Sequence, residues 1–463
     1  IAERSPANPS AALTLAVDAV SRDAWDDARK RLSEVPLQGV NRLLFPLLRA
    51  WAEAARANPA ALDAMKPLAD VAELRGIVDF HSALVSALLG RDEEAEAAFR
   101  RVSGGEGGMT PRVAEAFAAF LVARGREAEA RAMLDEAAAR DRDSLAFEML
   151  RARVEPGGRK PQATDARAGF AAALFDVATV LRGEGDGALA MPYARLATVL
   201  APAEAGAQLL VGDVLDQQKR HADAIAAFGR IDPSSALSWP ARLRVADSLR
   251  ALDRIDEAMA LLEKMAAERP ERIDALATKA GILRGKERFA EAAPVYDRAI
   301  ARVASPERRH WLLFFSRGIA FERSDQWPKA EADFRKALEL QPEQPDVMNY
   351  LAYSWVDKGF AEHFDRALRM LERAVELRPQ SGHIIDSLAW AFYKLGRYAE
   401  AVPLLERAVE ILPQEAVILD HLGDALWKVG RRNEARFQWQ RALGAKPEAE
   451  LKPVLERKLR DGL

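Results

Sequence analysis

The sequence predicts an all-α protein, a right-handed superhelical solenoid of about eleven to twelve helix-turn-helix repeats that ends in a capping helix. Three observations lead to this prediction: a 34-residue period, small residues at fixed places within it, and glycine or proline residues that divide it. The period is clearest near the C-terminus. There, Leu388, Ala389, Phe392, Ala401, Leu405, Ala408 and Pro413 are followed 34 positions later by Leu422, Gly423, Leu426, Ala435, Trp439, Ala442 and Pro447.

Each repeat is predicted to consist of helix A, a short turn and helix B. Small residues such as Ala389 and Ala401 lie where the two helix backbones approach most closely. Ala408 lies seven residues after Ala401, nearly two helical turns, so both alanines share one stripe of helix B. Gly396 marks the turn, because glycine adopts positive φ at little cost. Pro413 ends helix B, because proline lacks an amide hydrogen and clashes with the preceding turn.

The period continues towards the N-terminus with decreasing clarity. Leu351 and Ala367 are 16 positions apart, where the C-terminal repeats have 13, so we expect three inserted residues within 357–364 to form a rim loop. Residues 155–162 are rich in proline and glycine and cannot continue a helix. We therefore predict a divergent helical array over 1–154, a hinge over 155–168, a main array over 169–447 and a capping helix over 448–463.

Composition limits the classes of partner and compartment. The 463 residues include 67 basic and 70 acidic side chains, a balance that argues against nucleic acid or an anionic membrane as the main partner. No apolar run reaches the roughly 20 residues that span a bilayer. The absence of cysteine excludes thiol chemistry and is compatible with cytoplasm and periplasm alike. The polar opening Ile1–Pro9 is typical of a tether left by a removed export signal or lipid-anchor region, with simple trimming as the alternative.

The sequence contains no arrangement typical of an enzyme. Phosphate-binding, zinc-protease and serine-hydrolase motifs are missing, so we expect no catalytic residue, no cofactor and no metal. The six histidines are interpreted as surface or groove-lining residues. Asp386 and Asp420 occupy equivalent positions on adjacent helices about 10 Å apart, which is wide for an acid–base pair. We interpret them as polar groups of a groove.

The spacing and residue types of these repeats resemble the tetratricopeptide repeat. That resemblance implies a scaffold that binds a protein or peptide partner along a concave surface lined by helix A. By the resemblance and by helical spacing, the groove is predicted to contain Asn349, Tyr353, His383, Asp386, Trp390, Tyr393, Lys394, Asp420, Asp424, Trp427 and Lys428. Large aromatic rings beside hydrogen-bonding groups suit a peptide-binding surface. The alternative is that Trp390 and Tyr393 merely pack between helices.

The groove differs from the variant of this repeat that clamps a terminal carboxylate with lysine and asparagine. Its equivalent positions carry Asp386, Asp420 and Asp424, so we expect a hydrophobic, amide-rich or basic peptide instead.

A finer resemblance rests on the segments 349–355, 386–390, 420–424, 430–432 and 438–439. They are similar to bacterial envelope lipoproteins of the tetratricopeptide class that bind and activate carboxyl-terminal processing proteases. This resemblance implies a periplasmic scaffold, associated with the outer membrane, that presents substrates to such a protease. A structural assembly factor for envelope polysaccharide or outer-membrane machinery is the alternative. Self-association into a homo-oligomer stays open.

Overall fold

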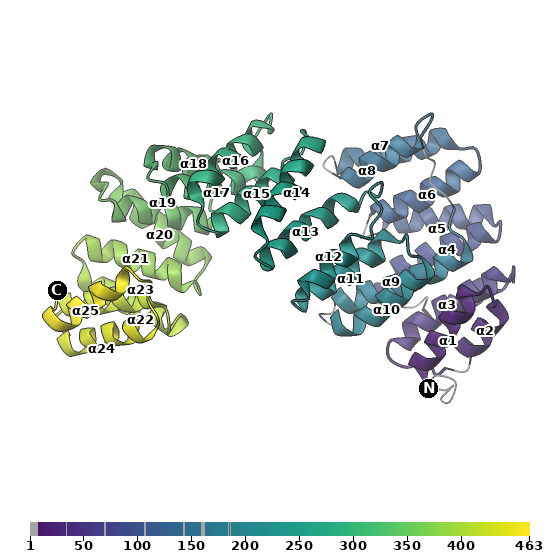
Figure 1. Cartoon of the computed structure of the whole chain (residues 1–463), viewed down its shortest axis with the longest axis horizontal. Helices are drawn as coiled ribbons and strands as arrows, with labels where there is room; N and C mark the ends of the chain where they lie inside the picture. Colours follow the sequence, from purple (N-terminus) through teal and green to yellow (C-terminus); the bar gives the residue numbers. More distant parts are fainter. Residues whose placement is uncertain are drawn as a thin grey trace. The chain divides into compact units, whose positions relative to one another are not determined.

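The computed structural model describes residues 8–33, 35–68, 71–105, 108–141, 144–158, 163–183, 185 and 187–463. Every regular element in these ranges is helical, and consecutive helices pack against each other in pairs (Figure 1). The chain forms two compact units, Ile1–Leu261 and Leu262–Leu463. The predicted all-α array of helical hairpins is confirmed.

The first unit contains the N-terminal hairpins. Its helices are α1 (Pro9–Ser21), α2 (Trp25–Ser33), α3 (Asn41–Ala55), η2 (Ala61–Leu68), η3 (Ala72–Leu74), α4 (Arg75–Leu88), α5 (Asp92–Gly104), α6 (Pro111–Ala123), α7 (Glu127–Arg140), α8 (Leu145–Val154), α9 (Ala166–Gly183), α10 (Gly187–Leu200), α11 (Ala205–Gln217), α12 (His221–Phe228) and α13 (Ser238–Ala251); α14 (Ile255–Glu268) crosses the division between the units. The described pairs here are α1 with α2, α3 with η2, α4 with α5, α6 with α7, α9 with α10 and α11 with α12.

Two of these helices begin where the sequence supplies a cap followed by proline. The Asn8 side chain accepts hydrogen bonds from the backbone N–H groups of Ser10 and Ala11, and Pro9 opens α1. Thr110 accepts from the N–H of Val113 in the same way at α6. Such caps satisfy amide groups that have no partner inside the helix. The remaining residues of the predicted N-terminal tether, 1–7, lie outside the described residues.

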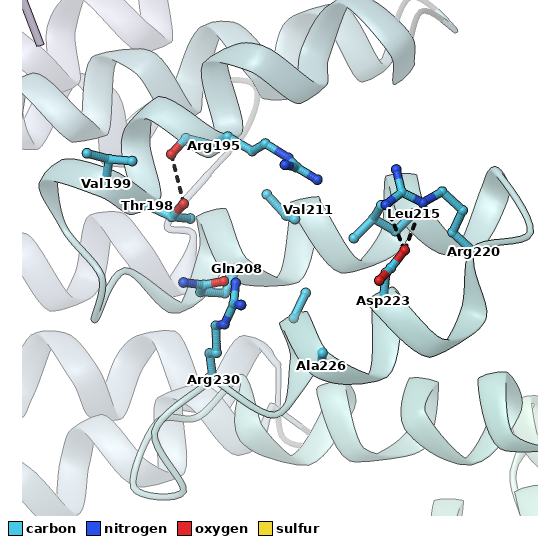
Figure 2. Close-up of a pocket in the computed structure, with 11 residues that line it drawn as sticks. Arg195, Thr198, Val199, Gln208, Val211, Leu215, Arg220, Asp223, Ala226 and Arg230 are labelled. Atoms are coloured by element: carbon cyan, nitrogen blue, oxygen red, sulfur yellow. Dashed lines mark hydrogen bonds and ion pairs between the residues drawn. The ribbon is translucent and has the colours of Figure 1, made fainter.

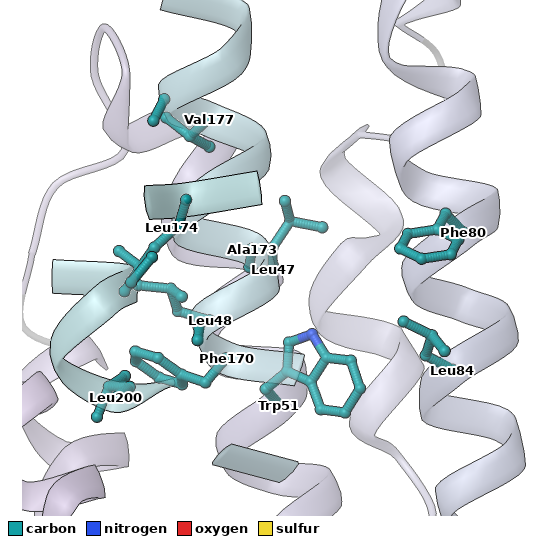
Figure 3. Packing of buried hydrophobic residues seen from close by; sticks show 14 of the residues in the cluster. Leu47, Leu48, Trp51, Phe80, Leu84, Phe170, Ala173, Leu174, Val177 and Leu200 are labelled. Atoms are coloured by element: carbon teal, nitrogen blue, oxygen red, sulfur yellow. The ribbon is translucent and has the colours of Figure 1, made fainter. Parts of the chain in front are cut away.

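Helix α9 packs against α3 and α4, which both lie far before it in the chain. Trp51 of α3 is fully buried, and Figure 3 shows it between Phe80 and Leu84 on one side and Phe170 on the other. A Cβ atom at Gly169 would lie 2.2 Å from the Trp51 ring, so the absence of a side chain allows α9 to approach. The two sides of the predicted hinge therefore share one core.

A buried polar network joins the same helices. The Trp51 indole N–H donates to His81 Nδ1 at 2.9 Å, and His81 Nε2 lies 2.9 Å from Asp176 Oδ2. Asp176 also pairs with Arg112, whose guanidinium lies 4.9 Å from the Phe175 ring centroid. Burial would raise the pKa of Asp176, but Arg112 and His81 hold this pKa below its usual value. His81 is wholly buried, so its interpretation as a surface or groove histidine is wrong.

The division between the compact units lies at Leu261, within α14. The boundary over 155–168 stays a prediction. Helix α9, which follows that segment, packs on α3 and α4, a contact that spacing along the chain does not reveal. Residues 159–162 of the predicted hinge lie outside the described residues.

The second unit continues as regular hairpins. After α14 it contains α15 (Asp274–Gly285), α16 (Phe289–Ala301), η4 (Arg308–His310), α17 (Trp311–Glu322), α18 (Trp327–Leu340), α19 (Pro345–Asp357), η5 (Ala361–His363), α20 (Phe364–Leu377), α21 (Gly382–Lys394), α22 (Tyr398–Ile411), α23 (Ala416–Lys428), α24 (Arg432–Gly444) and α25 (Leu451–Asp461). The pairs are α15 with α16, α17 with α18, α19 with α20, α21 with α22 and α23 with α24.

The turns within hairpins share one backbone conformation. Gly396 and Gly430 have φ of 75° and 88°, as the turn prediction requires. Asp325 occupies the equivalent position at φ 57°, so the turn forms even without glycine. The inserted residues between α19 and α20 form the short helix η5, where the His363 ring lies 4.5 Å from the Trp355 ring.

Helix α25 lies within the predicted capping segment 448–463 and packs against α24. Leu455 is fully buried there. A solenoid needs such a helix, because its last hairpin would otherwise expose an apolar face. None of the described helices is both long and apolar enough to cross a membrane.

Candidate functional site

The predicted groove residues lie on three A helices of the second unit, α19, α21 and α23. Helix α21 packs against both α19 and α23, so the three form one continuous surface, which we call the helix-A face. Residues three or four positions apart on one helix share a side of it. Asn349 and Tyr353 of α19 are therefore neighbours, as are Trp390 and Tyr393 of α21.

Aromatic rings form a stack at the centre of the helix-A face. Trp390 lies parallel to Tyr393, with ring centroids 4.7 Å apart, and parallel to His421 of α23, at 3.9 Å. Tyr393 also meets Tyr398 edge to face at 5.1 Å. Trp390 and Tyr393 are half-buried, so one part of each ring packs between helices and another part reaches solvent. The packing alternative therefore holds for one part of each ring, and binding of a ligand by the other part stays a prediction.

His421 is held by a carboxylate of the neighbouring helix. Its Nδ1 lies 2.9 Å from Asp386 Oδ1, and both side chains are buried. Burial alone would lower the pKa of His421, but the charges of Asp386, Asp420 and Asp424 outweigh it and raise this pKa above its usual value. The interpretation of His421 as a surface or groove-lining side chain is corrected by this burial. His310 is buried as well.

Asp420 and Asp424 share a buried lysine from the capping helix. Lys458 Nζ donates to Asp420 Oδ1 at 2.7 Å and to Asp424 Oδ2 at 2.8 Å. Asp424 also accepts the indole N–H of Trp439 at 3.0 Å. Burial and the charge of Asp420 raise the pKa of Asp424 above its usual value, against the opposing effect of Lys458. One lysine therefore offsets part of the charge of these two carboxylates, which weakens the expectation of an acidic groove.

The α19 side of the helix-A face carries several polar groups. Asn349 Oδ1 is buried and has no hydrogen-bond partner among the described residues. Tyr353 is half-buried; burial, followed by the charge of Asp357, raises the pKa of its hydroxyl well above the usual value, so it stays a hydrogen-bond donor. Lys394 lies 3.6 Å from Asp357 Oδ1 and 5.3 Å from the Trp390 ring centroid.

The other predicted groove residues lie towards the edges. His383 and Lys428 are exposed. Trp427 is half-buried and packs against Trp439, with ring centroids 5.4 Å apart, while the guanidinium of Arg432 lies over its ring at 5.3 Å. Trp427 therefore belongs largely to the packing between α23, α24 and the C-terminal end of the unit.

The arrangement suits binding better than proton transfer. Asp386 is bonded to His421 and Asp420 to Lys458, so neither carboxylate is free to approach a substrate. What the face offers to a ligand is a buried acceptor, a phenol donor and the exposed parts of two stacked rings. These groups match an extended peptide, which supplies backbone N–H donors and apolar side chains.

Sequence reasoning missed Lys458, although a signal for it exists. Lys458 lies 34 positions after Asp424, so the repeat register, carried into the capping helix, places it at the equivalent helix-A position. A lysine one period after an aspartate predicts an ion pair between neighbouring A helices. For His81 and Asp176, which are 95 positions apart, no such spacing signal exists.

The class of protein follows from these repeats. Residues 278–345 and 357–416 match the family described as "Tetratricopeptide repeat". These two segments, both in the second unit, therefore contain tetratricopeptide repeats.

The chain is similar to the TPR repeat-containing protein PA4667 of Pseudomonas aeruginosa, with 27% identity over 192 residues. The match spans 41% of this chain and about a third, 31%, of that relative's length. Among solved structures, a chain of the APC/C hetero-tetramer Cut9–Hcn1 has 13% identity and a TM-score of 0.45, and covers 98% of this chain and 96% of its own. YrrB, a TPR protein with an unusual peptide-binding site, has 21% identity and a TM-score of 0.33, and covers 42% and 97%.

Proposed function

We propose that the protein is a non-enzymatic adaptor that holds an extended segment of a partner protein on the helix-A face, across α19 and α21. The observation that carries this proposal concerns the side-chain amide oxygen of Asn349, Oδ1. This atom is buried and accepts no hydrogen bond from any described residue. A buried acceptor without a partner costs free energy, which a ligand's backbone N–H would recover.

The surroundings of Asn349 favour a peptide over a small ligand. Tyr353, one turn further along α19, presents a hydroxyl, and Trp390 and Tyr393 on α21 present stacked rings for apolar side chains. The His421 and Tyr393 rings fix the Trp390 side chain before binding, so little rotamer freedom is lost when a ligand covers it. Aromatic residues held in this way are typical of the residues that dominate binding energy.

The partner and compartment are proposed from the resemblance of residues 349–439 to envelope adaptors. On that basis the partner is a carboxyl-terminal processing protease, which the adaptor binds, activates and brings together with substrates in the periplasm at the outer membrane. Holding enzyme and substrate on one scaffold raises their effective concentration without new chemistry.

The test is a crosslinked pull-down from a native envelope fraction, with Asn349→Leu and the double variant Tyr353→Ala/Trp390→Ala as baits beside the wild type. Leucine is compatible with the fold at the Asn349 position, because two other repeats have leucine at the equivalent position, Leu209 and Leu243. The control is Phe437→Ala, which removes an aromatic side chain that is 62% exposed on α24.

We expect the wild type and the control to enrich a protease of this class, and both groove variants to lose it. Circular dichroism checks that helix content is unchanged. If all baits capture the protease equally, the helix-A face is not the binding site. If every bait instead captures the same polysaccharide-assembly or outer-membrane proteins, the chain is a structural subunit held by another surface.

A further inference from the structure

A cavity of about 310 Å³ lies in the first unit, between the B helices α10 and α12 and above the A helix α11. It is separate from the helix-A face described above. Apolar side chains form its floor, where Val211, Leu215 and Ala227 are buried, and Val199 forms an exposed apolar wall. Figure 2 shows Arg195 directed towards Val211 and Arg230 directed towards Gln208.

Gln208 is a polar residue at a position that the regular repeats fill with apolar side chains. It lies four residues before Gly212, and the equivalent residues of the second unit are Leu276, Phe314, Met348, Ile385 and Leu419, all of them buried; in the adjacent α13 the equivalent residue is Arg242. Gln208 is only 4% exposed, and its Oε1 has no hydrogen-bond partner among the described residues. Its amide nitrogen is 3.5 Å from the carbonyl of Pro202. Gln208, which lines the cavity, therefore has a buried acceptor atom, Oε1, without a donor among the described residues.

Arg230 lacks the contact that its counterparts make. Six positions after the first alanine of helix B, Arg407 and Arg441 donate to the carbonyls of Pro379 and Pro413 in the preceding repeat. Arg230 occupies the same place, but it has no hydrogen bond or ion pair among the described residues, and the equivalent carbonyl of Pro202 faces Gln208. Arg195, on the other side, makes no ion pair with any described acidic residue, and its Nε contacts Met191 Sδ at 3.4 Å.

Arg220 differs from these two arginines, although it also lines the cavity. It pairs with Asp223 at 2.7 Å, as Arg397 pairs with Glu400 in a regular repeat. This pair is therefore a general feature of the hairpin turn. Two guanidinium groups, Arg195 and Arg230, remain available to an anion.

We propose that this cavity binds the C-terminal residue of a polypeptide that ends in an apolar side chain. The terminal carboxylate pairs with Arg230 and Arg195, the backbone N–H of the same residue donates to Gln208 Oε1, and its side chain lies on Val211 and Leu215. A bare phosphate offers no N–H donor and no apolar group, and acetate offers no N–H donor and only a methyl group. The volume is at the lower end of ligand sites, which suits one or two residues and not a folded surface.

Fluorescence anisotropy on the full chain tests this proposal. The probes are four labelled hexapeptides of alanine whose last residue is alanine, valine, leucine or phenylalanine with a free carboxylate. Each is compared with its C-terminal amide and with an amidated form that carries one internal aspartate. We expect the free-carboxylate forms with apolar ends to bind at least tenfold more tightly than either amidated form, because charge-assisted hydrogen bonds to the arginines are lost.

The variants separate this cavity from other surfaces. Gln208→Leu restores the apolar residue of the regular repeats, so we expect it to keep or raise the melting temperature while weakening the peptide about tenfold. Arg230→Gln should weaken it by a similar factor. The matched control Arg407→Gln changes the equivalent arginine in the second unit and should leave affinity unchanged. Tyr353→Ala/Trp390→Ala should also leave it unchanged, because those residues belong to the helix-A face.

Three outcomes overturn the proposal. The first is that none of the four free-carboxylate peptides binds at concentrations up to about 1 mM. The second is equal binding of free-carboxylate and amidated forms. The third is that Arg407→Gln or the Tyr353/Trp390 variant weakens binding as much as Gln208→Leu does. The third outcome would place the peptide-binding site in the second unit instead. It would not contradict the proposed adaptor function.

Discussion

At the scale of single residues, the main feature of the helix-A face is a set of buried, charged side chains. Asp386, Asp420 and Asp424 come from two neighbouring helices, and each would be costly to bury alone. His421 and Lys458 supply the compensating groups at hydrogen-bond distance. The sequence pattern indicated where these carboxylates lie, but it could not show their partners. One partner comes from the capping helix, and the other is a histidine whose protonation the fold itself favours.

The raised pKa of His421 predicts a pH-dependent stability of the second unit. Because the folded-state pKa lies above the unfolded value near 6.5, the stabilisation is fully present below about pH 6.5 and is lost as pH rises through the folded-state pKa. We expect amide hydrogen exchange in α21 and α23 to accelerate over this rise beyond the intrinsic effect of pH. His421→Gln is the reference, since it cannot titrate. Parallel profiles for the two proteins would contradict the prediction.

At the scale of elements, many hairpins pair a small residue on helix A with a large one on helix B, although α9 and α10 have alanine at both positions, Ala178 and Ala194. Where helix A has glycine, helix B has an aromatic residue, as in the pairs Gly212 with Phe228, Gly318 with Phe334, and Gly423 with Trp439. Where helix A has alanine, as at Ala352 or Ala389, the equivalent helix-B residue is leucine, at Leu371 or Leu405. The pairs Ala83 with Phe99 and Ala280 with Tyr296 are exceptions. In these pairs, the two side chains together fill the space where helix A crosses helix B, so a smaller residue on one helix is matched by a larger residue on the other.

Gly318→Ala should destabilise the second unit by about 1–3 kcal/mol, because the new Cβ would lie 2.6 Å from Phe334 in a filled core. The double variant Gly318→Ala/Phe334→Leu reproduces the alanine–leucine crossing of α19 and α20. We expect it to recover a large part of the loss in urea unfolding. If the double variant is less stable than the single one, the two positions do not exchange volume as inferred.

Elements are also the scale at which the sequence was most informative. The 34-residue period predicted the hairpins, their turns and the capping helix, because these depend on contacts between residues close in the chain. It gave no sign that α9 packs on α3, since Trp51 and Gly169 are more than one hundred positions apart and neither belongs to a repeated pattern. For the helix-A face, the sequence pattern placed the aromatic residues on the A helices, whereas it did not indicate Lys458 as a partner or the burial of His421.

At the scale of the whole molecule, the first unit departs from a simple row of repeats. In such a row, each hairpin contacts its neighbours alone. Here α9 contacts α3 and α4, and α10 contacts α1, so the unit closes on itself. The network of Trp51, His81, Asp176 and Arg112 ties these helices with hydrogen bonds that are shielded from water.

This closure predicts that the first unit survives a break in its chain. A specific protease site inserted at Gly157, followed by cleavage, should leave the two parts associated during gel filtration without denaturant. Asp176→Ala leaves the buried His81 and the half-buried Arg112 without their carboxylate, so the nicked variant should separate at a lower urea concentration. Separation of the nicked wild type without denaturant would contradict the closure.

The arginines that bind carbonyls of the preceding repeat have a consequence for protein engineering. Arg407 and Arg441 each belong to one hairpin, while their acceptors, Pro379 and Pro413, end the hairpin before it. A hairpin excised at its loops would therefore contain the arginine of one such hydrogen bond and the acceptor carbonyl of the next. It would form neither bond, because both partners lie in other hairpins. The module to transplant into another array runs from the B helix of one repeat to the B helix of the next.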